Sequence, residues 1–478
     1  MSFVTLDREG RSPLHRQLYR EIRRGVLRGL VHPGARIPPT RTLAEELGVS
    51  RNTVTNAIDQ LIAEGFLEAR VGDGTYVCEQ LPESLPEVVE KCTNCEEAIP
   101  APERVKFWEG LEDWVVFHDQ QTRLFRPGAP DLGLFPWRLW EDARARAMRR
   151  RGPGLLQYNQ PEGLLDLREL LADHLRETRS LVCDASQIII CSGSQQGLDL
   201  IARVMMDAGD QVAWEDPGYA CVAQAWKSYR FEMLPMPVDE EGIRPEENAR
   251  PKMIYVTPSC QYPTGVPMSL RRRLELLDYA RRVGAWIVED DYDGEFRYSG
   301  RPVSSLQGLD GGRRVFYLGT FSKTLHPALR LGYMVVPKTL VAAFRKAKAY
   351  SDMMSPYMDQ AALTEFLAEG HWHRHVRRMT AVYGRRRKAL LESLREHPDL
   401  FRFADYGNGM ILTVRLPSGV DDRKLEERAG LRNMAVKALS RFYYRREPCP
   451  GLLMGFTAFP EEALRQGVRQ LTELIQRL

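Results

Sequence analysis

From about residue 119 to the C-terminus, short and continuously apolar runs alternate with stretches of helical periodicity. The apolar runs are QIIICSGS, DQVAWEDPGY, KMIYVTPSCQYPTG, AWIVEDDYD and RVFYLGTFSK, and patterns such as LRRRLELLDYARRVG separate most of them. Strands that are apolar throughout are typical of a parallel sheet with helices on both faces. The pattern therefore predicts an α/β fold with a mainly parallel sheet.

A smaller C-terminal α+β domain is expected at the end of the chain. The last segment, EEALRQGVRQLTELIQRL, places its apolar residues on one helical face, and these are Leu464, Val468, Leu471, Leu474 and Ile475. Such a helix needs a core to cover that face. We expect it to pack the small domain.

The chain divides into three regions. A length of 478 residues favours two or three domains. Residues 1–78 contain short helical patterns and a Gly-rich hairpin, residues 79–118 are rich in Glu and Pro and are typical of a linker, and residues 119–478 form the α/β region. A net charge of +3 indicates no particular partner, so partners must be inferred locally.

Targeting signals and disulfide patterns are not evident. No basic segment followed by an apolar stretch opens the sequence, and no run of 18 apolar residues predicts a membrane span. The eight cysteines are mostly scattered singly, as expected of free thiols in a reducing cytoplasm. Cys92 and Cys95 have zinc-like spacing, but no second ligand pair lies near them, so a structural or incidental role is favoured and no metal is predicted.

Residues 40–77, TRTLAEELGVSRNTVTNAIDQLIAEGFLEARVGDGTYV, have the pattern of a helix-turn-helix with a wing. Gly48 permits a tight turn between two short amphipathic helices, and Ser50 can cap the second one. The expected inner faces are Leu43, Ala44 and Leu47 in the first helix and Val54, Ile58 and Leu61 in the second. Two extended segments around Gly72-Asp73-Gly74 predict a β wing.

The exposed start of the second helix carries Arg51, Asn52, Thr53 and Thr55, which suit contacts with phosphates and base edges in a major groove. The alternative is a small helical packing domain, because residues 1–78 hold 11 arginines against nine acidic residues. Lysine is absent there, so all the positive charge is carried by arginine, which binds phosphate bidentately. DNA binding is the favoured interpretation.

This N-terminal region resembles the winged helix of GntR-type bacterial regulators. The matching segments are PLHRQLYREI, GARIPPTRTLAEELGVSRNTV and LIAEGFL, and Pro39 stands where the family usually has Ser. The resemblance implies that Arg41, Arg51, Thr53 and the wing near Gly74 contact operator DNA.

Lys323 lies in a short polar turn between two apolar runs, in YLGTFSKTLHPALRLGYMVVP. Its amine can form an imine with an aldehyde. Ser322, Thr320 and Arg330 can hold a phosphate beside that imine. SGSQQGLDL offers a second phosphate-binding turn, where a strand enters a helix whose N-terminus favours an anion.

The run WIVEDDYDGEF places Asp290 at the carboxyl edge of the sheet, where ligands bind in such folds. A carboxylate there can pair with a protonated pyridine nitrogen, while Tyr292 can bond a phenolic oxygen and Tyr219 can stack on a ring. Taken singly, EDDYD is equally a solvated loop or a magnesium site, and GSQQG is a weak motif. In this order along alternating strands, they predict pyridoxal phosphate (PLP).

Residues from about 120 to 478 resemble fold-type-I aminotransferases of the aspartate aminotransferase class. The matching segments are QYNQPEGLLDLREL, EDPGY, TPSCQYPTG, VEDDYDGEF and GTFSKTLHPALRLGY. The resemblance implies that Lys323 is the internal aldimine lysine and that the other cofactor residues are Asp290, Tyr292, Tyr219, Ser194, Gln195, Ser322, Arg330 and Tyr262. Tyr158 would reach the phosphate of a neighbouring subunit, which implies a homodimer.

One motif departs from the family pattern. Tyr262 stands where aminotransferases usually have Asn, and Cys260 stands where closer relatives often have His. The contacts on that side of the ring therefore cannot be transferred unchanged.

A GntR-type winged helix joined to an aminotransferase-like domain resembles the MocR subfamily of regulators. The resemblance implies a regulator rather than an enzyme: an amine or amino acid effector displaces Lys323 as an external aldimine and shifts a conformational equilibrium. Arg441 is the candidate for an effector carboxylate, with Arg445 as its competitor, and both could be surface residues. The winged helix is expected to pack on the other subunit of the dimer.

Two other functions remain open at this stage. An active aminotransferase could carry an accessory DNA-binding module, because the lysine, the acid and the stacking ring are all present. Alternatively, the regulator could sense PLP itself and control vitamin B6 synthesis.

Overall fold

The computed structural model describes residues 4–8, 12–82, 107–108, 123–300 and 303–477. The chain forms two compact units, Met1–Val105 and Lys106–Leu478, which are described separately below. Most of the predicted linker, including Cys92 and Cys95, lies outside the described residues.

The N-terminal unit is a winged helix-turn-helix, as predicted. Gly48 ends α2 in the left-handed conformation (φ 63°), and the Ser50 hydroxyl caps α3 by accepting a hydrogen bond from the Thr53 N–H at 3.2 Å. The predicted inner face of α3 is buried. The elements are α1 (Leu14–Leu27), β1 (Arg36–Ile37), α2 (Thr40–Leu47), α3 (Arg51–Ala63), β2 (Leu67–Arg70) and β3 (Gly74–Val77), with the strands in the order β1-β3-β2.

The C-terminal unit is built on an eight-stranded sheet in the order β4-β11-β10-β9-β8-β5-β6-β7. All five apolar runs form strands of this sheet. Its central strands run parallel to one another, in the order β10-β9-β8-β5-β6. β11 returns antiparallel between β10 and β4. The strands are β4 (Ile188–Cys191), β5 (Gln211–Asp216), β6 (Glu232–Asp239), β7 (Gly242–Ile243), β8 (Met253–Val256), β9 (Trp286–Asp291), β10 (Val315–Thr320) and β11 (Gly332–Val335).

Helices cover both faces of this sheet, which explains why its strands are apolar throughout. On β4, Ile188 and Ile190 enter one hydrophobic core, while Ile189 enters another on the opposite face. The helices of this part of the unit are α6 (Trp137–Arg151), α7 (Leu165–Arg179), α8 (Ser194–Met205), α9 (Ala220–Lys227), α10 (Leu270–Val283), α11 (Leu306–Asp310), α12 (Val341–Asp352) and α13 (Tyr357–Ala368). Short 3₁₀ helices are η3 (Leu132–Leu134), η4 (Gly152–Leu156), η5 (Ala185–Gln187), η6 (Pro327–Leu329), η7 (Lys338–Leu340) and η8 (Leu439–Phe442).

The predicted small C-terminal domain is an antiparallel sheet in the order β12-β14-β13, packed by helices. All five apolar residues predicted for the last helix are buried. The elements are β12 (Ile411–Arg415), α15 (Asp422–Leu431), β13 (Lys437–Ala438), β14 (Gly451–Gly455) and α16 (Glu461–Gln476). The α+β prediction is therefore confirmed.

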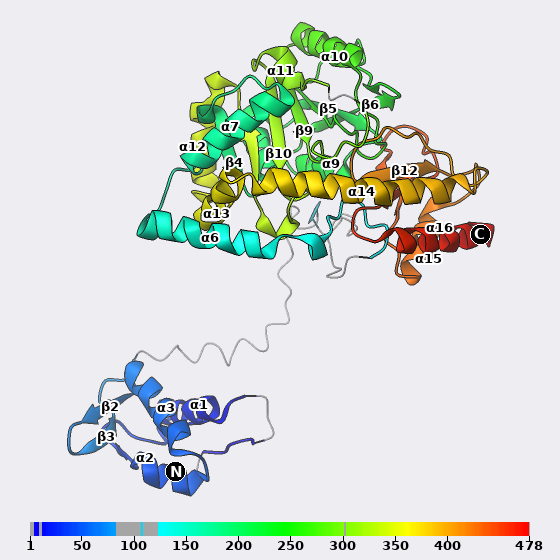
Figure 1. Ribbon diagram of the computed structural model, residues 1–478. Helices are drawn as coiled ribbons and strands as arrows, with labels where there is room; N and C mark the ends of the chain where they lie inside the picture. The colour runs from blue at the N-terminus through cyan, green and yellow to red at the C-terminus, as the bar shows by residue number, and fades with distance from the viewer. Residues whose placement is uncertain (1–3, 9–11, 83–106, 109–122, 301–302, 478) are drawn as a thin grey trace. The chain divides into compact units, whose positions relative to one another are not determined.

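One long helix, α14 (His371–Arg395), belongs to both parts of the C-terminal unit (Figure 1). Near its start, Trp372 and Val376 pack in the core of the large sheet. Farther along, Met379, Tyr383 and Leu390 pack in the core of the small domain. The two parts therefore share one continuous helix.

Among the described residues, none of the helices has the length and apolar character that crossing a bilayer requires.

Candidate functional site

Lys323 lies in the turn between β10 and β11, as the sequence predicts. Its Nζ donates a hydrogen bond to the carbonyl oxygen of Gly128 at 2.9 Å. Burial lowers the pKa of the lysine, and the negative charges of Asp293 and Asp290 oppose that shift. An amine with a lowered pKa is more often unprotonated, which is the form that attacks an aldehyde.

Asp290 ends a buried segment of β9 and is only 4% exposed. Its Oδ2 accepts a hydrogen bond from the Tyr255 hydroxyl at 2.8 Å, while its buried Oδ1 has no partner among the described residues. Burial raises the pKa of Asp290 to about 7. The carboxylate thus presents one oxygen that is free to pair with a cation.

The neighbouring carboxylate, Asp291, has a different environment. Burial alone would raise its pKa, but the guanidinium of Arg179 and the hydroxyl of Tyr317 lower it below its ordinary value. The Arg179 Nε lies 2.8 Å and the Tyr317 hydroxyl 2.5 Å from Asp291 Oδ2. Asp291 is therefore held as a structural anion by Arg179, whereas Asp290 has no ion pair of this kind among the described residues.

Three predicted tyrosines contact one another. The ring of Tyr262 makes edge contacts with Tyr219 and Tyr292, with centroids 5.2 and 6.0 Å apart, and with Phe442 at 5.4 Å. The Tyr292 hydroxyl donates to the carbonyl of Cys260 at 3.0 Å. Where aminotransferases usually have Asn, this site therefore has an aromatic ring.

The two predicted phosphate-binding segments meet at the start of α8, whose first residues are Ser194 and Gln195. Arg330 Nη2 donates to the Ser192 carbonyl at 2.6 Å. Gly193 has a φ of 86°, and a Cβ there would lie 3.0 Å from the same guanidinium nitrogen. The Thr320 hydroxyl donates to the Ser322 Oγ at 3.1 Å. A helix N-terminus, a guanidinium and hydroxyls, groups suited to binding a phosphate, thus lie on neighbouring segments.

These residues fit PLP. The unpartnered Asp290 oxygen suits the protonated pyridine nitrogen, and the Arg330 guanidinium beside Gly193 at the start of α8 suits the phosphate. Lys323 supplies the amine for the aldehyde.

Two predicted residues lie apart from this group. Tyr158 follows η4 and is 82% exposed, so its role toward a neighbouring subunit stays a prediction. Arg441 lies on η8, where its Nε bonds Glu426 Oε2 at 2.9 Å. Its competitor Arg445 has a side chain that is 65% exposed and lies 4.0 Å from Glu246.

Sequence reasoning missed four residues of the site. They are Gly128, Tyr255, Asp293 and Glu215. Glu215 Oε2 accepts a hydrogen bond from the Thr257 hydroxyl at 2.6 Å, and this bond connects β5 to the residue that follows β8. Burial raises the pKa of both Glu215 and Asp293 to about 7. For Glu215, a charged residue directly after an apolar run was the available signal.

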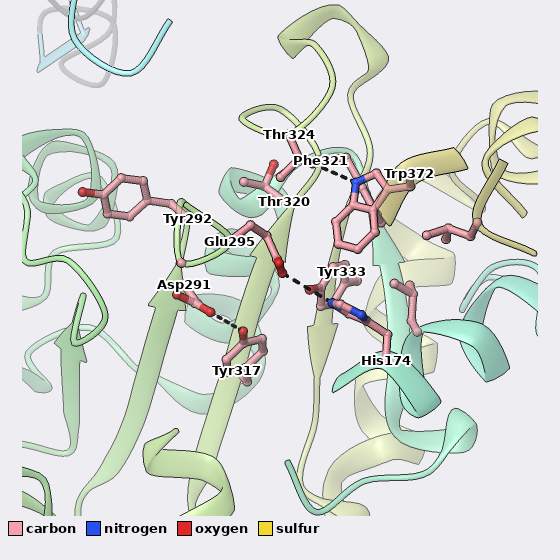
Figure 2. A pocket seen from close by; sticks show the side chains of 13 residues that line it. His174, Asp291, Tyr292, Glu295, Tyr317, Thr320, Phe321, Thr324, Tyr333 and Trp372 are labelled. Atoms are coloured by element: carbon pink, nitrogen blue, oxygen red, sulfur yellow. Dashed lines mark hydrogen bonds and ion pairs between the residues drawn. The ribbon is translucent and has the colours of Figure 1, made fainter. Parts of the chain in front are cut away.

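Behind the lysine turn lies a small polar pocket, where side chains from β9, β10, β11, α7 and α14 converge (Figure 2). Trp372 Nε1 donates to the Thr324 hydroxyl at 3.2 Å, next to Lys323. In the same pocket, His174 Nε2 lies 3.4 Å from Glu295 Oε1. The start of α14 therefore contacts the lysine turn directly.

The predicted DNA-reading residues lie on the surface of the N-terminal unit. Arg51 is exposed at the first position of α3, and Thr53 forms part of the cap, with its hydroxyl 2.8 Å from the Ser50 Oγ. The Arg41 side chain is 83% exposed and pairs with Glu45 at 3.3 Å. Gly74 has a φ of 142° at the wing, where a Cβ would lie 2.9 Å from Arg36 Nε.

Comparisons with known proteins agree with both halves of this description. Residues 14–77 match the family "Bacterial regulatory proteins, gntR family", and residues 134–450 match "Aminotransferase class I and II". The probable rhizopine catabolism regulatory protein MocR of Rhizobium meliloti is 36% identical over 98% of this chain and 95% of its own length. The pyridoxine biosynthesis transcriptional regulator PdxR of Corynebacterium glutamicum is 30% identical over 96% of this chain and 95% of its own length.

Solved structures extend the comparison to the fold of the C-terminal unit. The multiple substrate aminotransferase of Thermococcus profundus superposes with a TM-score of 0.70 at 30% identity, covering 79% of this chain and 96% of its own. The fold and the family matches identify the cofactor as PLP. The chain belongs to the gntR family of bacterial regulatory proteins, in the MocR subfamily, which joins a DNA-binding winged helix to an aminotransferase-like domain.

Proposed function

We propose that this protein is a transcription regulator that senses an amine or amino acid at Lys323 and changes its binding to operator DNA in response. The observation that carries the proposal is the Lys323 amine, which has a lowered pKa and lies in a site fitted to PLP. The same chain carries a DNA-binding winged helix. When bound, PLP supplies an aldehyde that forms an imine with a primary amine and can exchange one amine for another.

In this proposal, each residue has a defined role. Lys323 holds the cofactor until an effector amine displaces it, and Asp290 pairs with the ring nitrogen. Tyr219 stacks on the ring, and Tyr292 bonds its phenolic oxygen. The remaining contacts hold the phosphate, and we assign them to Ser194, Gln195, Ser322 and Arg330, with Tyr158 from a second subunit.

Arg441 is our candidate for binding the effector's carboxylate. In the structure its Nε is paired with Glu426, which also accepts hydrogen bonds from the Lys437 Nζ and the Ala438 N–H, each at 2.9 Å. An effector carboxylate at Arg441 would therefore compete with Glu426. That exchange would loosen a contact between η8 and α15 and so connect effector binding to the small domain.

The proposed assembly is a homodimer with two winged helices that bind repeated operator half-sites. Arg41, Arg51, Thr53 and the wing near Gly74 are the proposed DNA contacts. The exposed ring of Tyr158 is accessible to a partner subunit, as this assembly requires.

The test combines a spectroscopic titration with a DNA-binding measurement. The PLP-loaded protein is titrated with amines and amino acids while the visible absorbance of the cofactor and the mobility of an operator fragment are followed. We expect one class of amine to change both signals at the same concentration, without accumulation of pyridoxamine phosphate. Amine-induced absorbance changes that leave DNA binding unaltered at every concentration would contradict the sensor.

An active aminotransferase is the second candidate, because the lysine and the ring-nitrogen acid are both in place. The solved relatives at 30–31% identity are aminotransferases. Sustained conversion of an amino acid with a keto acid acceptor would favour this function. Regulation by PLP alone, as the name of the Corynebacterium relative suggests for that protein, predicts an operator response that needs no amine.

A further inference from the structure

Tyr255 is a core residue on β8 that no catalytic pattern singles out. It is 0% exposed, and its ring makes an edge contact with Trp226 at 6.0 Å between centroids. The parallel register pairs Tyr255 with Val288 on β9. Asp290 lies two residues beyond Val288, on the same face of that strand. The register therefore brings the phenol to the carboxylate.

Because of the hydrogen bond between these two groups, the two Asp290 oxygens have different roles. The Tyr255 hydroxyl donates to Oδ2 at 2.8 Å, whereas Oδ1 is buried without a partner among the described residues. A buried carboxylate without a compensating donor is strongly disfavoured as an anion. The phenol thus lowers the cost of ionisation and leaves one oxygen available.

The charged surroundings of Asp290 make this donor important. Asp291 on its own strand raises the pKa of Asp290, Lys323 from the turn after β10 lowers it, and burial dominates both effects. Glu215, at the end of β5, is also buried near Asp290. Arg179, the nearby arginine, is bound to Asp291 and Glu295. Tyr255 is therefore the neutral donor that Asp290 has in place of an arginine.

We infer that Tyr255 is a positioning residue for the cofactor: its hydroxyl holds one oxygen of Asp290 so that the other accepts a hydrogen bond from the protonated ring nitrogen of PLP. The phenol favours the ion pair of carboxylate and pyridinium over the neutral pair of carboxylic acid and pyridine. Tyr255 thereby sets the protonation of the ring and its strength as an electron sink. The inference rests on the proposed PLP placement and holds for a sensor and for an enzyme alike.

The test is ¹⁵N NMR of the full-length protein loaded with PLP labelled at the ring nitrogen. In the native protein, we expect the signal of a protonated pyridine near neutral pH. In Tyr255→Phe, we expect the signal to move toward that of neutral pyridine, with deprotonation at a lower pH. 3,5-Difluorotyrosine at position 255 is a stronger hydrogen-bond donor of similar shape. With it, the ring nitrogen should stay protonated at least up to the pH at which it loses its proton in the native protein.

Tyr317→Phe is the matched control. It removes a buried phenol from the next carboxylate of the same strand, Asp291, which keeps Arg179 as its cation. We expect its ring-nitrogen signal to match that of the native protein.

A native signal in Tyr255→Phe across the pH range would overturn the inference. If Tyr255→Phe does not fold, the protein with difluorotyrosine provides the test. In that protein, a ring nitrogen that loses its proton at a lower pH than in the native protein would also overturn the inference. Failure of the native protein to bind labelled PLP would instead refute the cofactor placement.

Discussion

The amine of Lys323 donates its hydrogen bond to the carbonyl of Gly128, a residue 195 positions earlier in the chain, at 2.9 Å. Gly128 has a φ of 64°, and a Cβ at this position would lie 2.9 Å from the same Nζ. The segment that carries it is fixed to the small domain, because the Gly455 N–H donates to the Phe125 carbonyl at 2.8 Å. The reactive lysine therefore contacts a segment anchored on β14.

Gly128→Ala should impair cofactor loading, because its methyl group would occupy the space beside the lysine amine. The control is Gly284→Ala, which has a similar φ of 78° but no atom within 4 Å of the added Cβ. Both variants should lose about 1 kcal/mol of stability from the left-handed backbone. Only Gly128→Ala should need several-fold more PLP in an absorbance titration. Equal PLP affinities in the two variants would contradict the predicted crowding.

Lys323→Ala should abolish the visible absorbance of the lysine-bound cofactor and the response of DNA binding to amines. Operator affinity without effector should persist, because the winged helix is a separate compact unit. Absorbance spectra and operator mobility shifts measure the two effects. A full response to an amine in this variant would exclude covalent sensing at Lys323.

Arg51→Ala should have the reverse effect. Loss of one arginine contact to a phosphate or base at the start of α3 should weaken operator binding about 10-fold or more. The cofactor spectrum should remain native. Fluorescence anisotropy with labelled operator gives the affinity, and unchanged affinity at several salt concentrations would remove Arg51 from the DNA contacts.

Arg441→Gln and Glu426→Gln should change effector affinity in opposite directions. The first removes the proposed partner of the effector carboxylate and should weaken amino acid binding about 10- to 100-fold. The second removes the anion that competes for Arg441 in the structure, so amino acids should bind more tightly. Simple amines without a carboxylate serve as the control ligand in absorbance titrations. If the affinities for amino acids and for simple amines changed by the same factor, Arg441 would have a purely structural role.

The cofactor-free protein should lose stability as the pH rises from about 4 to about 7. Burial raises the pKa of Glu215, Asp290 and Asp293 to about 7, so the folded state binds more protons than the unfolded state in this window. The free energy of unfolding therefore falls with rising pH as far as these groups determine it.

A ring-nitrogen cation should offset part of this loss by pairing with Asp290. Pyridoxamine phosphate, which forms no imine with Lys323, should therefore stabilise the protein more at pH 8 than at pH 5. Urea unfolding with and without this ligand measures the difference. A stabilisation independent of pH would show that Asp290 gains no cationic partner.

The positions of Lys323 and Asp290 could be predicted because Lys323 follows the apolar strand β10 and Asp290 lies near the end of β9, and the carboxyl ends of parallel strands meet at one edge of the sheet. The winged helix was predictable for a similar reason: Gly48 and Ser50 are local signals for a turn and a cap. In both cases, the information lies within a few residues of the feature.

Tyr255 and Gly128 could not be predicted, because their roles depend on tertiary register. Tyr255 lies in the middle of an apolar strand, where a tyrosine is usually a core residue, and its partner is fixed only when β8 pairs with β9. The pairing of Arg441 with Glu426 likewise requires α15 to pack beside η8. Side-chain partners across elements are set by packing, which sequence periodicity does not encode.

Helix α14 gives the C-terminal unit a mechanical property. A sharp bend of α14 at the boundary between the two cores would break backbone hydrogen bonds, so this helix can act as a stiff lever between the two parts. Trp372, near the short end of that lever, holds the hydroxyl of Thr324, next to Lys323. A small displacement at the lysine turn would therefore be magnified along the helix toward the far end of the small domain.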